Sequence, residues 1–214
     1  MSAYSPGPVA VHREAGFSLI VVLLLLVVVT VLGVGAAQLS IVNEFGARSD
    51  RDHEVAFQAA EAALIEAELD VFGPNRDGRA RHCLFDERDI SPFAPGCGRE
   101  GARNHGLCAA ADPGAMPTWM KADLSPESET SVAYGTFTGQ NYAAVSGGSA
   151  APPRYVIEAV RNRGGWEANR LPSASAGDVT HIFRVTAIGF GVRKETRVVL
   201  QTTLYKPVPS AGCP

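Results

Sequence analysis

The residues best suited to chemistry lie in the middle of the chain and are of the types that bind zinc: His82, Cys83, Cys97, His105 and Cys108. Structural zinc sites usually bring cysteines in close pairs such as C-x2-4-C, whereas thirteen and ten residues separate the successive cysteines here. With Cys213 the chain has four cysteines, in a part rich in Gly and Pro. The spacing therefore favours two disulfides, formed in an oxidising compartment, and we expect neither a metal nor a cofactor.

Four cysteines allow three pairings, and the sequence does not choose between them. A local loop is the simplest expectation. It would join Cys83 to Cys108, or Cys83 to Cys97.

Other chemical motifs are weak. The only stretch that resembles the G-x-S motif around a serine nucleophile is Gly16–Ile20. No GxG pair is followed by the third glycine that a phosphate-binding loop requires. Four acidic residues could suggest a divalent-ion site, but such a group on a helix is usually a solvated face: Asp50, Asp52, Glu54 and Glu61. The aromatic residues Trp119, Trp166 and Tyr155 are expected in the core. The sequence therefore predicts no enzyme.

The elements that carry these residues begin with a long apolar run. Between Ala15 and Asn43 there is no Asp, Glu, Lys or Arg, and Phe17–Ala37 would span about 31 Å as a helix, close to the thickness of a bilayer. The net charge is −3, with scattered basic residues, so no nucleic acid is expected as a partner.

An alanine-rich stretch continues this run. From Ala47 to Phe72 there is no Gly or Pro, and apolar residues recur at helical spacing, with Glu61, Glu66 and Glu68 placed elsewhere on the wheel. Gly73-Pro74-Asn75 is expected to end the helix with a turn.

The remainder is expected to be a small globular domain. Residues 76–114 are predicted to be a disulfide-pinned loop, with further loops at 146–153 and 171–177. Strands are predicted at 154–161, 181–190 and 195–205, the last two forming a hairpin. The predicted fold is α+β: a long N-terminal helix packed on a small antiparallel sheet with disulfide-bearing loops. The predicted divisions are 1–16, 17–43, 44–72 and 73–214.

Two alternatives explain the apolar run alone. A secretory signal peptide could be cut after Ala37, but its hydrophobic part would be longer than the usual 7 to 15 residues. An ordinary membrane anchor does not account for the sequence Gly16-Phe17-Ser18-Leu19-Ile20 that opens the run.

That pentapeptide resembles the site where prepilin peptidase cuts type IV pilins, after Gly16, leaving an N-terminal Phe17 that is usually methylated. The stretch Ala56–Leu64 (AFQAAEAAL) resembles the PilX family of minor type IV pilins. The resemblance implies a pilin-like fold and an assembly helix that includes Val21, Ala59, Ala60 and Glu61.

It also implies where the protein works and with what. A minor pilin starts in the bacterial inner membrane as a single-pass protein with a cytoplasmic N-terminus, and later joins a pilus in the periplasm or at the cell surface. The implied partners are prepilin peptidase, the inner-membrane assembly platform, the major pilin and other minor pilins. The implied function is to prime or cap pilus assembly at or near the tip, supporting piliation, twitching motility and adhesion.

One position departs from major pilins, which carry a Glu where this chain has Val21. PilX-like minor pilins and the tip pseudopilin of type II secretion also lack that Glu. A minor pseudopilin of type II secretion therefore remains an alternative, as does an adhesive module that uses the loop 76–117.

Overall fold

The fold comes from a computed structural model of the chain, which describes residues 17–76, 81–142, 148–162, 180–207 and 213. The predicted leader, Trp166 and the predicted loop at 171–177 lie outside the described residues. The chain forms two compact units, Met1–Arg48 and Ser49–Pro214.

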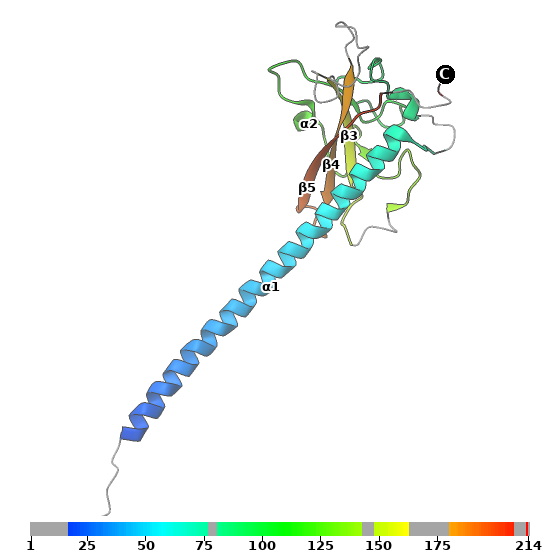
Figure 1. The fold of residues 1–214 in the computed structure, drawn as a ribbon. Coiled ribbons are helices and arrows are strands. Elements are labelled where there is room, and N and C mark those ends of the chain that lie inside the picture. Colours follow the sequence, from blue (N-terminus) through cyan, green and yellow to red (C-terminus); the bar gives the residue numbers. More distant parts are fainter. Residues whose placement is uncertain (1–16, 77–80, 143–147, 163–179, 208–212, 214) are drawn as a thin grey trace, which may run out of the picture. The chain divides into compact units, whose positions relative to one another are not determined.

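Helix α1, Phe17–Phe72, is a single helix of 56 residues that runs through the predicted apolar and alanine-rich stretches (Figure 1). It ends where predicted. Gly73 has φ 81°, a conformation that glycine adopts without a steric penalty, and its N–H donates to the carbonyl of Leu69 at 2.8 Å.

The second unit is built on a five-stranded sheet in the order β1-β3-β4-β5, with β2 paired to β3. The strands are β1 (Leu107–Ala109), β2 (Val132–Ala133), β3 (Arg154–Arg161), β4 (His181–Phe190) and β5 (Arg197–Leu204). The bounds of β3 and β4 are those predicted, β5 lies within its predicted range, and β4 and β5 form the predicted antiparallel hairpin.

The sequence predicts an antiparallel sheet, but the observed sheet is mixed. Strand β1 pairs with β3 in parallel. The predicted loop at 76–114 also contains regular structure, namely β1 and the 3-10 helix η1 (Arg81–Leu84). A second short helix, α2, covers Thr118–Lys121. These elements are too short for sequence periodicity, and β1 exists because it pairs with a strand about fifty residues away.

The C-terminal part of α1 packs on one face of this sheet, as the cyan helix beside β3 and β4 in Figure 1 shows. Its contact face is a stripe of small buried residues: Ala56, Ala59, Ala60, Ala63 and Ala67. The backbones approach so closely at Gly189 that a Cβ there would lie 2.1 Å from the carbonyl oxygen of Ala56. Alanine and glycine are therefore what permits this contact.

Large side chains fill the core beside the alanine stripe. Phe85 and Phe93 pack against Phe183 of β4, with ring centroids 5.4 and 5.6 Å from it. The buried core joins the helix, the sheet and the loop before β1 into one cluster.

All four cysteines form disulfides, as predicted, but in the pairing that was not expected. The bonds are Cys83–Cys213 and Cys97–Cys108, so both local pairings suggested for Cys83 are wrong. Cys108 lies on β1, which brings it to Cys97, while the chain after β5 returns to η1 and meets Cys83. The bond between Cys83 and Cys213 thus follows from the path of the folded chain and not from sequence distance.

Candidate assembly helix and its anchorage on the sheet

The first part of α1 presents an apolar surface. From Leu19 to Phe45 its large apolar side chains are between 40 and 75 % exposed, and Val21 is at the lower limit. Among the described residues, α1 from Leu19 is the one helix whose length and apolar character suffice to cross a membrane, with a mean hydropathy of 3.2 in its most apolar part. Phe17 is the first residue of α1, and Gly16 lies outside the described residues.

The other predicted assembly residues have two different environments. Ala59 and Ala60 are 3 % and 0 % exposed, because they belong to the stripe that packs on the sheet. Glu61 is exposed. Within this chain, then, the alanines hold the helix on the sheet, and Val21 and Glu61 are the members of the set whose side chains reach solvent.

Asp52 anchors the helix to the β4–β5 turn. The sequence placed it on a solvated face, but it is buried, and its carboxylate accepts hydrogen bonds from the side chains of Arg193 at 2.9 Å and Thr196 at 2.5 Å. The backbone N–H of Arg193 also donates to it. The hydrogen bond from Thr196, together with those from Arg193, lowers the pKa of Asp52 from 3.8 to about 2.

Glu66 is the second acidic residue that the sequence misplaced. It is 1 % exposed, and its Oε1 accepts hydrogen bonds from the backbone N–H of Gly135 at 2.9 Å and from the hydroxyl of Thr138. Burial raises the pKa of Glu66, and these hydrogen bonds act against the rise. Glu66 thus ties the helix to the loop that follows β2.

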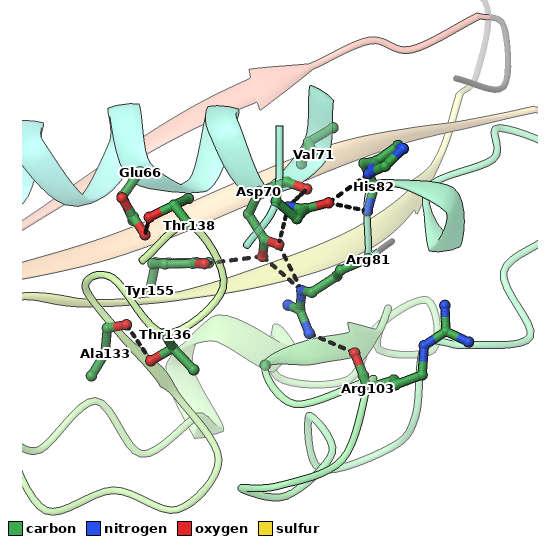
Figure 2. Close-up of polar contacts among 12 residues, drawn as sticks. Glu66, Asp70, Val71, Arg81, His82, Arg103, Ala133, Thr136, Thr138 and Tyr155 are labelled. Atoms are coloured by element: carbon green, nitrogen blue, oxygen red, sulfur yellow. Dashed lines mark hydrogen bonds and ion pairs between the residues drawn. The ribbon is translucent and has the colours of Figure 1, made fainter. Parts of the chain in front are cut away.

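Asp70 anchors the end of the helix, as Figure 2 shows. Its two carboxylate oxygens each lie 2.8 Å from Nε of Arg81, and one also accepts from the hydroxyl of Tyr155 at 3.0 Å. Arg81 is 1 % exposed, donates to the carbonyl of Arg103 at 2.7 Å and stacks 3.6 Å from the centre of the Phe137 ring. Burial raises the pKa of the Asp70 carboxyl, and the Arg81 guanidinium opposes that rise.

Lys206, just after β5, completes the anchorage. Its ammonium group donates to the carbonyl of Val71, in the last turn of α1, at 2.8 Å and to the carbonyl of His82. A cation at this end of a helix is favourable because the last carbonyls have no partner within the helix. Burial lowers the pKa of Lys206 from 10.5 to about 8.

The cluster that suggested zinc is not brought together. Cys97 and Cys108 are joined to each other, whereas His82 and Cys83 lie near Cys213. Because the four sulfurs are paired as disulfides, they do not offer the thiolates that a zinc site of this kind requires.

Two family models match the chain, one over most of α1 and the other over the sheet. The PilX N-terminal model matches residues 15–64, and the model described as type IV pilus assembly protein PilX C-term matches residues 104–206. This chain belongs to the PilX family. The N-terminal match contains the apolar segment and the alanine stripe up to Leu64, and the C-terminal match contains all five strands.

Membership in the PilX family gives the chain a general role. It is a minor pilin of the type IV pilus, a structural subunit that contacts other pilus components, and its apolar N-terminal helix fits a membrane-anchored protein of the cell envelope or surface. No curated protein and no solved structure matches the chain.

Sequence reasoning missed the three anchors at Asp52, Glu66 and Asp70. One signal was present: small residues at positions 56, 59, 60, 63 and 67 follow a helical spacing that marks a close contact, and the two glycines at 189 and 191 suit its other side. Acidic residues that flank such a stripe lie at the margin of the contact, where a hydrogen-bonding partner from the sheet can reach them.

Proposed function

We propose that this minor pilin primes or caps assembly at or near the tip of the pilus. It is inserted in the inner membrane with its N-terminus in the cytoplasm, cut by prepilin peptidase between Gly16 and Phe17, and drawn into the filament from the assembly platform. There it contacts other minor pilins and the major pilin, and it supports piliation and twitching motility.

Val21 is the observation that carries the tip position. Major pilins resemble this chain but have an acidic residue there, which is neutralised by the N-terminal amine of the subunit ahead. A carboxylate left unpaired in a bilayer costs about 2.5–3.5 kcal/mol on insertion scales, whereas Val favours insertion. The segment 15–43 contains no charged residue, which suits a subunit with none ahead of it.

Adhesion is a further role that the second unit supports. A cavity of about 590 Å³ lies beside the Cys97–Cys108 disulfide, and α2 forms part of its wall with Thr118 and Lys121. It falls largely within the C-terminal part of the proposed adhesive loop and the segment that follows it.

The N-terminus of the mature protein tests the processing step. We expect sequencing of the protein from sheared pili to begin at Phe17, because the peptidase pattern retains the apolar helix. A protein that begins at Gln38 would show a signal peptide instead, and an intact Met1 would show an uncut anchor.

The exchange Val21→Glu tests the tip position. In a strain that lacks the wild-type gene, we expect the variant to reach the membrane but to support fewer surface pili and less twitching motility, since its carboxylate has no partner. Val21→Ala is the matched control and should retain normal piliation. Incorporation of Val21→Glu along the whole filament, with normal piliation, would contradict the tip position.

A further inference from the structure

The cavity of about 590 Å³ lies where the segment before β1 separates from that strand. The segment runs beside β1 at Ala94, whose carbonyl accepts a hydrogen bond from the N–H of Ala109 at 3.0 Å. It then turns away, since the N–H of Cys97 donates to the same carbonyl at 3.1 Å. The lining includes this turn, residues 95–97, and the chain that leaves β1, residues 109–111.

Three contacts hold the walls of this cavity in place. The disulfide between Cys97 and Cys108 ties the turn to β1, and the hydroxyl of Thr118 on α2 donates to the last carbonyl of β1 at 2.9 Å. The guanidinium of Arg154 donates to three carbonyls of the loop 126–131, which supplies another part of the lining. The cavity is therefore preformed, as binding sites for small ligands usually are.

Small residues form most of the lining. Five of the thirteen lining residues are alanines, and Pro95 and Gly96 add two more small apolar groups. Among the lining residues that the structure describes, none is aromatic, so the walls lack the flat ring faces on which a planar ligand would stack. Such walls suit a ligand with short aliphatic side chains.

Both signs of charge are present on the lining. Asp112, Lys121 and Asp123 all belong to it, and within the described residues neither carboxylate forms an ion pair with the ammonium group. The carboxylate of Asp123 accepts a hydrogen bond from the N–H of Ser125 at 2.9 Å, which lowers its pKa and keeps it charged. The aspartates would repel a purely anionic ligand and the lysine a purely cationic one, whereas a ligand with both charges can pair with both.

The backbone offers a further contact in the same cavity. Ala111, two residues beyond the residue that pairs with Ala94, makes no backbone hydrogen bond with another described residue. Its N–H and C=O are therefore available to water or to the amide groups of a ligand. Free backbone groups of this kind favour a ligand that itself contains a peptide bond.

We propose that this cavity binds a short peptide that carries both a free ammonium and a free carboxylate group, with small aliphatic side chains between them. Lys121 binds the carboxylate, Asp112 and Asp123 bind the ammonium group, and Ala111 binds the peptide bond. This ligand class rests on the adhesive role proposed above, because it names the ligand of the cavity to which that role is assigned. It holds for any position of the subunit in the pilus.

Titration of the full chain in detergent micelles with the dipeptide alanyl-alanine provides the test, followed by the amide NMR signals of residues 109–123. We expect saturable shifts with a dissociation constant on the order of 1 mM, because the probe is small. N-acetyl-alanyl-alanine lacks the ammonium group, and alanyl-alanine amide lacks the carboxylate. Each should therefore bind about fivefold more weakly than the dipeptide itself.

Two variants assign the charges to their partners. Lys121→Gln should bind the dipeptide about fivefold more weakly and no longer distinguish it from its amide, because the carboxylate has lost its partner. Asp123→Asn should narrow the difference between the dipeptide and its acetylated form. Lys194→Gln is the matched control: this exposed lysine lies outside the cavity lining, and its variant should bind as wild type does. Unchanged amide signals of β3 and β4 show that each variant is folded.

Two results would overturn the ligand class. One is equal binding of the dipeptide and its two blocked forms, and the other is the absence of a saturable shift up to about 20 mM dipeptide. A stronger response to a neutral disaccharide than to the dipeptide would have the same meaning.

Adhesion of cells that carry wild type or Lys121→Gln separates the ligand class from the adhesive role. Reduced adhesion of the variant, with no dipeptide binding by wild type, would overturn the ligand class and retain the adhesive role. Dipeptide binding with unchanged adhesion would support the ligand class and refute the adhesive role.

Discussion

The buried pair of Asp70 and Arg81 permits a stringent test of how the helix is held. We expect Arg81→Met to lower the free energy of unfolding of the second unit by about 3–5 kcal/mol, because it leaves a buried carboxylate without its cation. The hydroxyl of Tyr155 would remain as a partner but cannot neutralise the charge. A typical protein is stable by 5–15 kcal/mol, so this loss is large.

The double variant Asp70→Asn/Arg81→Met separates charge from packing. It removes both charges while Asn can still accept from Tyr155, and we expect it to lie within about 1.5 kcal/mol of the wild type. Lys194→Met is the control, since Lys194 and its partner Glu127 have exposed side chains, and it should cost less than about 1 kcal/mol.

Urea titration of the full chain in detergent micelles, followed by tryptophan fluorescence, measures these differences. Trp119 lies in the second unit and reports its unfolding. A loss below about 1 kcal/mol for Arg81→Met, or a double variant as unstable as the sum of its two single exchanges, would refute the reasoning.

Two further predictions concern the contact between the helix and the sheet. Gly189→Ala should lower the free energy of unfolding by about 1–3 kcal/mol or more in the same titration, because the added Cβ would lie 2.1 Å from the carbonyl oxygen of Ala56. The control Thr203→Ala, on an exposed face, should have little effect. Because Thr196 holds the pKa of Asp52 below its unfolded value of 3.8, the stabilisation by Asp52 is present above pH 4 and is lost as the pH falls towards 2. Thermal unfolding should therefore show that wild type is more stable than Asp52→Asn at pH 6, and that this difference in stability shrinks between pH 4 and 2. A difference in stability that does not change with pH would contradict this.

The elements with strong local signals could be predicted from the sequence. The bounds of β3 and β4 were predicted to the residue, because runs of β-branched and aromatic residues are delimited there by turn residues. The end of α1 at Phe72 was predicted because Gly73 and Pro74 follow it.

The features that depend on distant residues could not be predicted. β1 and β2 carry too few residues for a pattern and owe their conformation to pairing with β3. Asp52 and Glu66 are polar residues at the margin of an apolar face, and a helical pattern alone cannot show that a turn or a loop supplies them with hydrogen bonds. The partner of Cys83 depends on where the chain runs after β5.

The bond between Cys83 and Cys213 determines how the second unit responds to mechanical load. The five strands that the structure describes lie between these two residues, so the sheet sits within a covalent ring that the chain enters from α1 at Cys83. When an assembled pilus is pulled, tension that arrives through α1 meets the ring at Cys83. The C-terminus is then not a free end from which β5 could be peeled away. A load applied between α1 and the residues around Cys213 therefore passes through the two sulfur atoms, and the strands inside the ring do not carry it while the bond is oxidised.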